Sequence, residues 1–95
     1  MKRIISSPFA PKAVGPYSQA VEANGTLYIS GQLPIDPTTG KMVEGIEAQT
    51  ARSLDNIRAI LEEAGYTLDD VVKSTVLLAD IADFGAMNAV YAKYY

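Results

Sequence analysis

The 95-residue sequence contains no cysteine and no histidine. Without cysteine there is no disulfide framework and no thiol nucleophile. Without histidine the chain lacks the commonest general base and the commonest metal ligand, so a zinc site would have to consist of carboxylates alone. A glycine-rich phosphate loop is also absent. We therefore expect no metal and no organic cofactor, and any chemistry must come from carboxylates, lysine, arginine, tyrosine, serine or the backbone.

The sequence also lacks an excess of positive charge and any long apolar run. Eight lysines and arginines face eleven acidic residues, which gives a net charge of −3 and a pI near 4.7. Nucleic-acid binding requires a basic patch, so we do not expect a nucleic-acid partner. No apolar run approaches the roughly 20 residues of a membrane span, and residues 2–5 are too short for a signal peptide. These absences predict a cytoplasmic protein with no membrane partner.

The composition is that of a globular protein, with 48% hydrophobic and 20% charged residues. The length predicts a single domain over residues 1–95. A chain this short buries a modest fraction of its surface, so association with further copies would stabilise it.

The sequence pattern predicts an α+β fold. Strands are expected at 3–6, 18–23, 26–30 and 71–79, and helices at 46–64 and 84–94. Asn24-Gly25 is typical of a two-residue hairpin turn, and Gly65 suits the end of the first helix. A parallel crossover could join the strands that flank this helix. The strand at 71–79 is apolar on both faces, which favours burial of one face in a subunit interface.

Two stretches stand out as candidate site segments. In residues 27–34 a strand ends abruptly at Ser30 and Gly31, and a glycine there often marks a bulge or a close approach of a ligand. In residues 15–20 a Gly-Pro turn delivers Tyr17 to the start of a strand. Simple strand termination and a boundary tyrosine are the alternatives for these residues. Asn88 is unfavourable in the middle of a helix, and surface exposure is its alternative explanation.

These stretches carry a resemblance that extends over the whole chain. The sequence resembles the RidA/YjgF family of imine/enamine deaminases in five ordered motifs: Gly-Pro-Tyr-Ser-Gln-Ala at 15–20, Ser-Gly-Gln-Leu-Pro at 30–34, Gln49, Ser-Leu-Asp-Asn at 53–56 and Met-Asn-Ala-Val-Tyr at 87–91. The resemblance implies a YjgF/chorismate-mutase-like mixed sheet with two helices packed on one face. It also implies a Pro-Ala-Arg segment and two further strands beyond Tyr95, one of them between the strands at 26–31 and 71–79. The final helix ends on Tyr94-Tyr95 without a terminating glycine, which we interpret as support for an interruption.

The activity that the resemblance implies is hydrolysis of 2-imino and 2-enamino acids, such as 2-iminobutanoate and 2-aminoacrylate, to 2-keto acids and ammonia. It implies a homotrimer with sites at subunit boundaries, where Tyr17, Ser30, Gly31 and Asn88 contact the substrate. The family's carboxylate-clamping arginine and water-positioning glutamate correspond to positions beyond Tyr95. We therefore expect residues 1–95 alone to have negligible deaminase activity.

Two other functions remain as alternatives. An endoribonuclease or translation inhibitor is a second role attached to the family, but the acidic pI and the lack of an aromatic-basic stripe argue against it. A non-catalytic ligand-binding or holdase-like module is the third possibility. Ammonia release from an imino acid would separate the first function from both alternatives.

Overall fold

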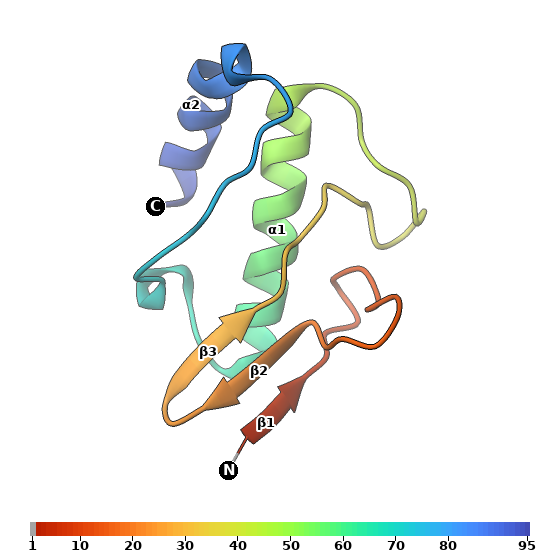
Figure 1. Cartoon of the computed structure of the whole chain (residues 1–95), viewed down its shortest axis with the longest axis vertical. Helices are drawn as coiled ribbons and strands as arrows, with labels where there is room; N and C mark the ends of the chain where they lie inside the picture. The colour runs from red at the N-terminus through yellow and green to blue at the C-terminus, as the bar shows by residue number, and fades with distance from the viewer. Residues whose placement is uncertain (1) are drawn as a thin grey trace.

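The computed structural model describes residues 2–95 and contains an antiparallel sheet and two α-helices (Figure 1). Strands β1 (Lys2–Ile5), β2 (Ala20–Ala23) and β3 (Thr26–Ile29) pair in the order β1-β2-β3. Helix α1 spans Ile46–Ala64 and helix α2 spans Phe84–Tyr94, and short 3-10 turns lie at Leu68–Asp70 and Ile81–Asp83. The α+β prediction is therefore confirmed.

The β2–β3 hairpin forms as its turn sequence predicts. Asn24 and Gly25 have φ angles of 53° and 77°, the positive values that a two-residue turn of this kind requires. The register pairs Ala23 with Thr26 and Ala20 with Ile29. The hairpin therefore delivers residues 18–19 and 30–31 to the same end of the sheet.

Helix α1 is the central element of the fold, and its ends lie where the sequence predicts. Gly65 adopts φ 88°, a left-handed value that glycine accommodates without strain, and its N–H bonds the carbonyl of Glu62. The core lies between the sheet and the C-terminal half of α1. It comprises Ile5, Ala10, Ala20, Ile60 and Ala64.

Helix α2 packs against α1, away from the sheet (Figure 1). Met87 and Val90 are buried. Tyr94 is also fixed, because its hydroxyl donates to Asp55 Oδ1 at 2.8 Å and its ring lies 5.3 Å from the Arg58 guanidinium carbon. Tyr91 and Tyr95 stack with their ring centroids 4.7 Å apart. The terminal tyrosines are therefore packed within the fold.

The predicted strand at 71–79 is not formed. Residues 71–78 run as an extended connection from the end of α1 to α2, drawn teal to blue in Figure 1, and no ladder joins them to the sheet. A strand requires a neighbour for its backbone groups, and none of residues 2–95 supplies one beside this segment. The expected parallel crossover is therefore absent from the described residues, and their sheet is purely antiparallel rather than mixed.

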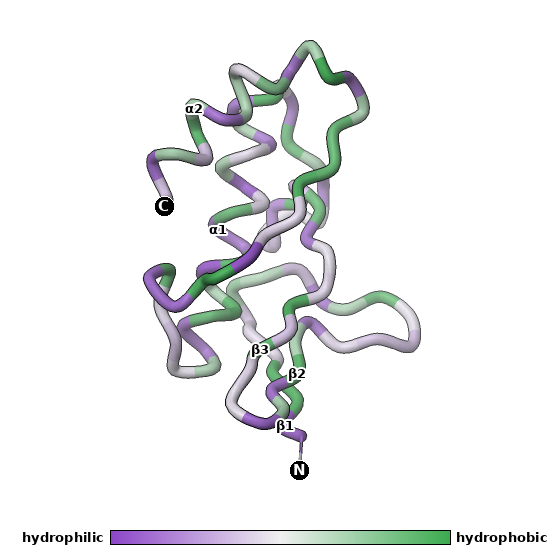
Figure 2. Tube along the Cα trace, turned by 60° about the vertical axis from the view of Figure 1, so that its left-hand side comes forward, coloured by the Kyte–Doolittle hydropathy of each residue, from purple (hydrophilic) through white to green (hydrophobic). Residues whose placement is uncertain are grey.

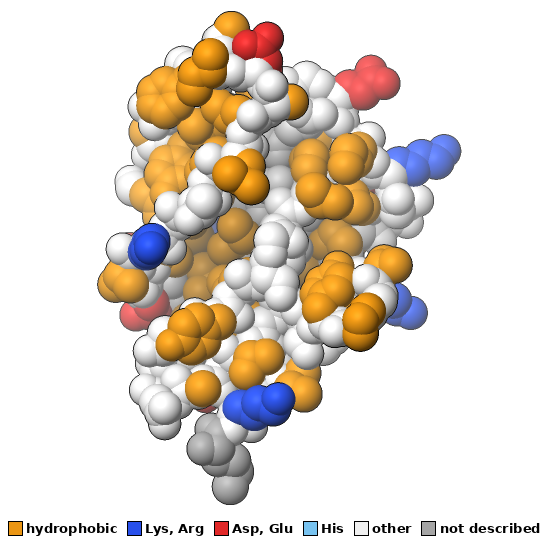
Figure 3. All heavy atoms as spheres, viewed as in Figure 1, with side chains coloured by type: hydrophobic (Ala, Val, Ile, Leu, Met, Phe, Trp, Pro, Cys, Tyr) orange, Lys and Arg blue, Asp and Glu red, His pale blue; other side chains and the backbone are white. Residues whose placement is uncertain are grey.

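The extended connection leaves a hydrophobic surface. Much of the extended connection has the hydrophobic colour in Figure 2. Figure 3 shows apolar side chains gathered over α2 and the connection beside it. Val72 and Leu77 are 97% and 89% exposed, and Ile81 and Phe84 are also exposed. We call the residues 72, 76, 77, 81 and 84 the apolar surface.

Candidate functional site

The two candidate segments lie side by side. Because Ala20 pairs with Ile29, the strand register places Gln19 opposite Ser30. The Ser30 N–H donates to the Gln19 carbonyl at 2.9 Å, and the Ser30 hydroxyl donates to the Ser18 carbonyl at 2.6 Å. Ser30 is therefore fixed through both its backbone and its side chain. The structure joins the end of the 15–20 segment to the start of the 30–34 segment.

Tyr17 and Gly31 border this junction. The Tyr17 side chain is half exposed, and its N–H closes a turn to the Gly15 carbonyl at 2.9 Å, where Gly15 has φ 94°. Gly31 is exposed, and a Cβ built on it would meet nothing within 4 Å. The atoms of residues 2–95 therefore do not require glycine at this position. What they leave is open space beside Ser30.

Asn88 lies elsewhere, on α2. It is exposed and lines a groove of about 460 Å³ between α2 and the extended connection. The groove is mostly apolar, and its lining includes Ser74, Leu78 and Tyr91. No hydrogen bond among residues 2–95 joins Asn88 to Tyr17, Ser30 or Gly31, and these three do not line the groove. The structure therefore brings three of the four candidate residues together and leaves Asn88 in a separate place.

Two buried amides hold the junction from behind. Gln19 is 3% exposed and its side chain bonds the loop before Tyr17. Asn56 on α1 is fully buried and its Nδ2 donates to the carbonyls of Leu33 and Ile35 at 3.2 and 3.0 Å. Both residues belong to motifs named above, at 15–20 and 53–56. The sequence did not predict their burial, because amide side chains seldom occupy the core.

The three arginines are all engaged within the fold. Arg3 pairs with Glu22 at 3.1 Å and donates to the Ala64 carbonyl at 2.9 Å. Arg52 donates to Asn56 Oδ1 at 3.0 and 3.2 Å, and Arg58 pairs with Asp55 at 2.7 Å. None of them contacts Ser30 or Tyr17 through a hydrogen bond. The described residues therefore present no unengaged guanidinium at the junction.

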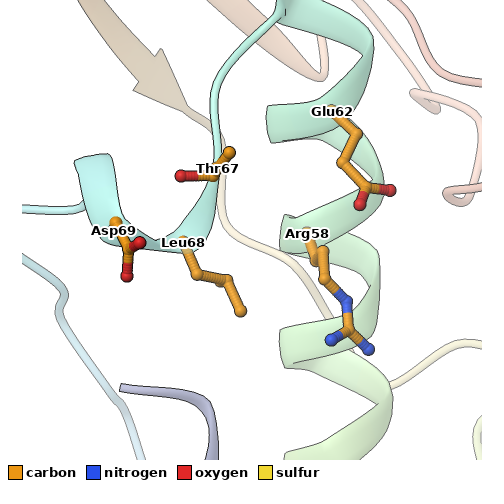
Figure 4. Close-up of a pocket in the computed structure, with 5 residues that line it drawn as sticks. All are labelled: Arg58, Glu62, Thr67, Leu68 and Asp69. Atoms are coloured by element: carbon orange, nitrogen blue, oxygen red, sulfur yellow. The ribbon is translucent and has the colours of Figure 1, made fainter.

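A second hollow, of about 240 Å³, lies beside the C-terminal half of α1. Figure 4 shows Arg58 and Glu62 on the helix opposite Thr67, Leu68 and Asp69. Its charged groups are of both signs, and Arg58 is already paired with Asp55. It contains none of the sequence-predicted residues.

The perturbed ionisable groups lie outside the junction. The Tyr66 hydroxyl donates a hydrogen bond to Glu22. This bond, followed by the bond from Arg3, lowers the pKa of the Glu22 carboxyl below its ordinary value. The same bond raises the pKa of Tyr66. Burial, followed by the bond to Asp55, raises the pKa of Tyr94. These groups tie elements of the fold together and are not candidates for proton transfer at Ser30.

Residues 2–95 contain no cluster of three potential metal-ligating side chains. Within the same residues no helix is long and apolar enough to cross a bilayer. The candidate site therefore rests on backbone groups, hydroxyls and an aromatic ring.

The sequence matches the model of a known protein family over most of its length. Residues 8–95 match the model described as Endoribonuclease L-PSP. The chain belongs to the RidA/YjgF family.

RidA/YjgF relatives align over the whole chain. A RutC family protein of Pyrococcus horikoshii is 56% identical over 96 residues, covering all of this chain and 76% of its own length. The 2-iminobutanoate/2-iminopropanoate deaminases of Capra hircus and Mus musculus are 52% and 46% identical, covering all of this chain and 70% and 71% of theirs. The chain thus spans about three quarters or slightly less of each relative's length.

Solved RidA/YjgF structures share the fold. The Rid family protein YyfA of Yersinia pestis superposes with a TM-score of 0.98 at 48% identity, over 100% of this chain and 76% of its own. E. coli TdcF, solved with bound serine, superposes with a TM-score of 0.94 at 38% identity, over 97% and 72%. The expected YjgF-like fold is therefore confirmed over residues 2–95.

Proposed function

We propose that this chain serves in the hydrolytic deamination of small 2-imino and 2-enamino acids to 2-keto acids and ammonia. The observation that carries the proposal is the junction of Tyr17 and Ser18 with Ser30 and Gly31. The names of the goat and mouse relatives support the reaction, and the serine bound to TdcF supports a small amino-acid-like ligand.

The junction suits one end of such a substrate. Gly31 is exposed, and among residues 2–95 its N–H has no hydrogen-bond acceptor, so it can donate to a carboxylate. Open space lies where a Cβ would stand on Gly31. The half-exposed Tyr17 ring offers an apolar wall with a hydroxyl at its end. We propose Tyr17, Ser30 and Gly31 as substrate-binding residues, and Asn88 as a fourth residue that a neighbouring chain would contribute.

A homotrimer would explain how Asn88 joins the site. The apolar surface beside Asn88 has the exposed hydrophobic character of an association surface. We propose that identical chains meet through it, with each site at a boundary between two of them.

Binding is tested first. We expect 2-ketobutanoate, the product, to perturb the backbone amide resonances of residues 15, 17–19 and 30–33 of the 95-residue chain. Tyr17→Ala should weaken this binding, whereas Tyr28→Ala, which removes a somewhat more exposed tyrosine from β3, should leave it unchanged. If the probe perturbs neither segment at millimolar concentration, the proposed site is wrong.

Turnover is tested separately, with 2-iminobutanoate formed in place from L-threonine by a pyridoxal-phosphate dehydratase. Because all three arginines are engaged, we expect negligible ammonia release by residues 1–95 alone. Fusion of residues 1–95 to the C-terminal part of the Capra hircus deaminase should produce turnover. In that fusion Tyr17→Ala should lower kcat/KM by about tenfold or more, since a misplaced substrate loses much of its rate.

The outcomes separate the candidate functions. A fusion that binds 2-ketobutanoate without accelerating ammonia release would favour a ligand-binding module. Salt-dependent cleavage of RNA by the same preparation would favour the endoribonuclease role, which the description of the matching family model also names.

A further inference from the structure

The side chain of Gln19 makes an unusual set of contacts for a residue at a strand edge. It is 3% exposed, and its Oε1 accepts from the Ser7 N–H at 2.5 Å. Its Nε2 donates to the carbonyls of Pro11 at 2.8 Å and Ser7 at 3.2 Å, with the Ala10 carbonyl at 3.5 Å. One amide thus satisfies both its donor and its acceptor capacity against a single loop.

These contacts attach the loop of residues 7–17 to the rest of the fold. Within the part of the chain that the structure describes, every hydrogen bond between residues 7–17 and the rest of the fold comes from the Gln19 side chain. The loop's other bonds are internal, such as Phe9 N–H to Ser7 Oγ and Tyr17 N–H to Gly15 O. Ala10 adds a small apolar anchor in the core. Loss of the amide would therefore free the loop that leads to Tyr17.

The main chain of Gln19 holds the other half of the junction. Its carbonyl accepts from the Ser30 N–H, and the adjacent Ser18 carbonyl accepts from the Ser30 hydroxyl. One residue therefore ties the 7–17 loop to β2 through its side chain and ties Ser30 to β2 through its backbone. Along the chain, Tyr17 lies between residues 7–11, which the Gln19 side chain bonds, and Gln19 itself.

We propose that Gln19 is a positioning residue, which holds the 7–17 loop so that Tyr17 and Ser30 keep a fixed separation when a 2-keto or 2-imino acid binds. This inference rests on the proposed function for its ligand. Gln19 does not touch the ligand. Its effect is transmitted through the placement of Tyr17.

The first test is proteolysis, because the chain carries a lysine in each of two loops held by a glutamine. Lys12 lies in the 7–17 loop. Lys41 lies in a loop that Gln49 contacts through its Nε2 bond to the Val43 carbonyl at 3.1 Å, and that loop is also closed by its own backbone, since the Asp36 N–H donates to the Lys41 carbonyl at 2.9 Å. We expect Gln19→Ala to accelerate tryptic cleavage after Lys12 about tenfold and to leave Lys41 unchanged. In the matched control, Gln49→Ala, cleavage after Lys12 should stay at the wild-type rate.

The second test reads the position of Tyr17 directly. 3-Fluorotyrosine placed at position 17 should give a shifted and broadened fluorine resonance in Gln19→Ala. Gln19→Glu keeps the shape of the side chain but places a carboxylate against carbonyl oxygens, so the resonance should be displaced at pH 7. It should return toward the wild-type position as the pH falls and the protonated carboxyl regains a donor. Circular dichroism of each variant confirms that α1 is intact.

The third test is binding of 2-ketobutanoate, for which Gln19→Ala should raise the dissociation constant about tenfold while Gln49→Ala leaves it unchanged. If wild type and Gln19→Ala bind equally and the Lys12 cleavage rate and fluorine resonance do not move, the role of Gln19 is refuted. If wild type itself fails to bind, the proposed function fails and Gln19 has no role in it. The cleavage and fluorine measurements then still show whether the residue holds the loop.

Discussion

Replacement of Asn56 by alanine is the sharpest test of how the fold supports the candidate site. The Asn56 side chain is fully buried in α1. Its amide donates to the carbonyls of Leu33 and Ile35 and accepts from the Arg52 guanidinium. It is therefore the connection between the central helix and the segment that follows Ser30. Alanine would remove all of these bonds and leave the carbonyls without their partner.

The magnitude follows from the number and exposure of the groups left unpaired. An unsatisfied buried acceptor costs about 1–3 kcal/mol. The two bonds are only partly buried, so water can reach the carbonyls in part and the lower end of that range applies to each. Including the lost Arg52 contact, we expect Asn56→Ala to lower the free energy of unfolding by about 2–4 kcal/mol. For a domain of this size that corresponds to a fall in Tm of about 10–25 °C.

The assay is urea unfolding followed by circular dichroism at the helical band. Asn88→Ala is the matched control, because Asn88 is an exposed asparagine in a helix and its loss should change stability by no more than about 0.5 kcal/mol. Asn56→Asp tests the donor role, since it keeps the shape but turns oxygen toward the two carbonyls. If Asn56→Ala unfolds at the same urea concentration as Asn88→Ala, the Asn56 amide does not stabilise the fold.

Three further predictions concern pH, assembly and metal. Because folding lowers the pKa of Glu22, the stability that this residue contributes is lost as the pH falls through its folded-state pKa. Because folding raises the pKa of Tyr66, the stability that this residue contributes is lost as the pH rises through its folded-state pKa. The Tm advantage of wild type over Tyr66→Phe should therefore be largest near neutral pH and shrink in acid and in alkali; parallel Tm curves at every pH would contradict it. Sedimentation should detect a trimer that Leu77→Lys weakens, whereas a stable monomer at micromolar concentration would exclude the proposed assembly. EDTA should leave the Tm unchanged, and a stoichiometric transition metal in elemental analysis would contradict the expectation that the protein holds no metal.

Local patterns predicted the elements that are stabilised by local interactions. The Asn24-Gly25 turn indicates the hairpin, and Gly65 indicates the end of α1. Because the hairpin is short, its register also placed the 15–20 segment beside Ser30. The adjacency of the two candidate segments was therefore predictable from the sequence.

The rest depends on partners that a local pattern does not contain. Residues 71–79 have the composition of a strand, but a strand forms only where a neighbour accepts its hydrogen bonds. Asn56 is two positions from Leu54 and so lies on another side of α1, and it is buried because residues 33–35 pass over it. The Gln19 amide likewise acquires its role from a loop that the chain brings back from residues 7–11. Tertiary contacts, rather than periodicity, decide these positions.

The extended connection also affects how the protein behaves at high concentration. Residues 74–79 form an uncharged, proline-free stretch that is rich in strand-forming side chains. They are mostly exposed and pair with no strand of the sheet. These properties are typical of a segment that is prone to aggregate. Lys73 and Asp80 flank it with opposite charges, as gatekeeper residues do in natural proteins. Their neutralisation should promote fibrous aggregates even where the folded chain keeps its stability. We therefore expect the two charges beside the apolar surface to limit aggregation while that surface is exposed.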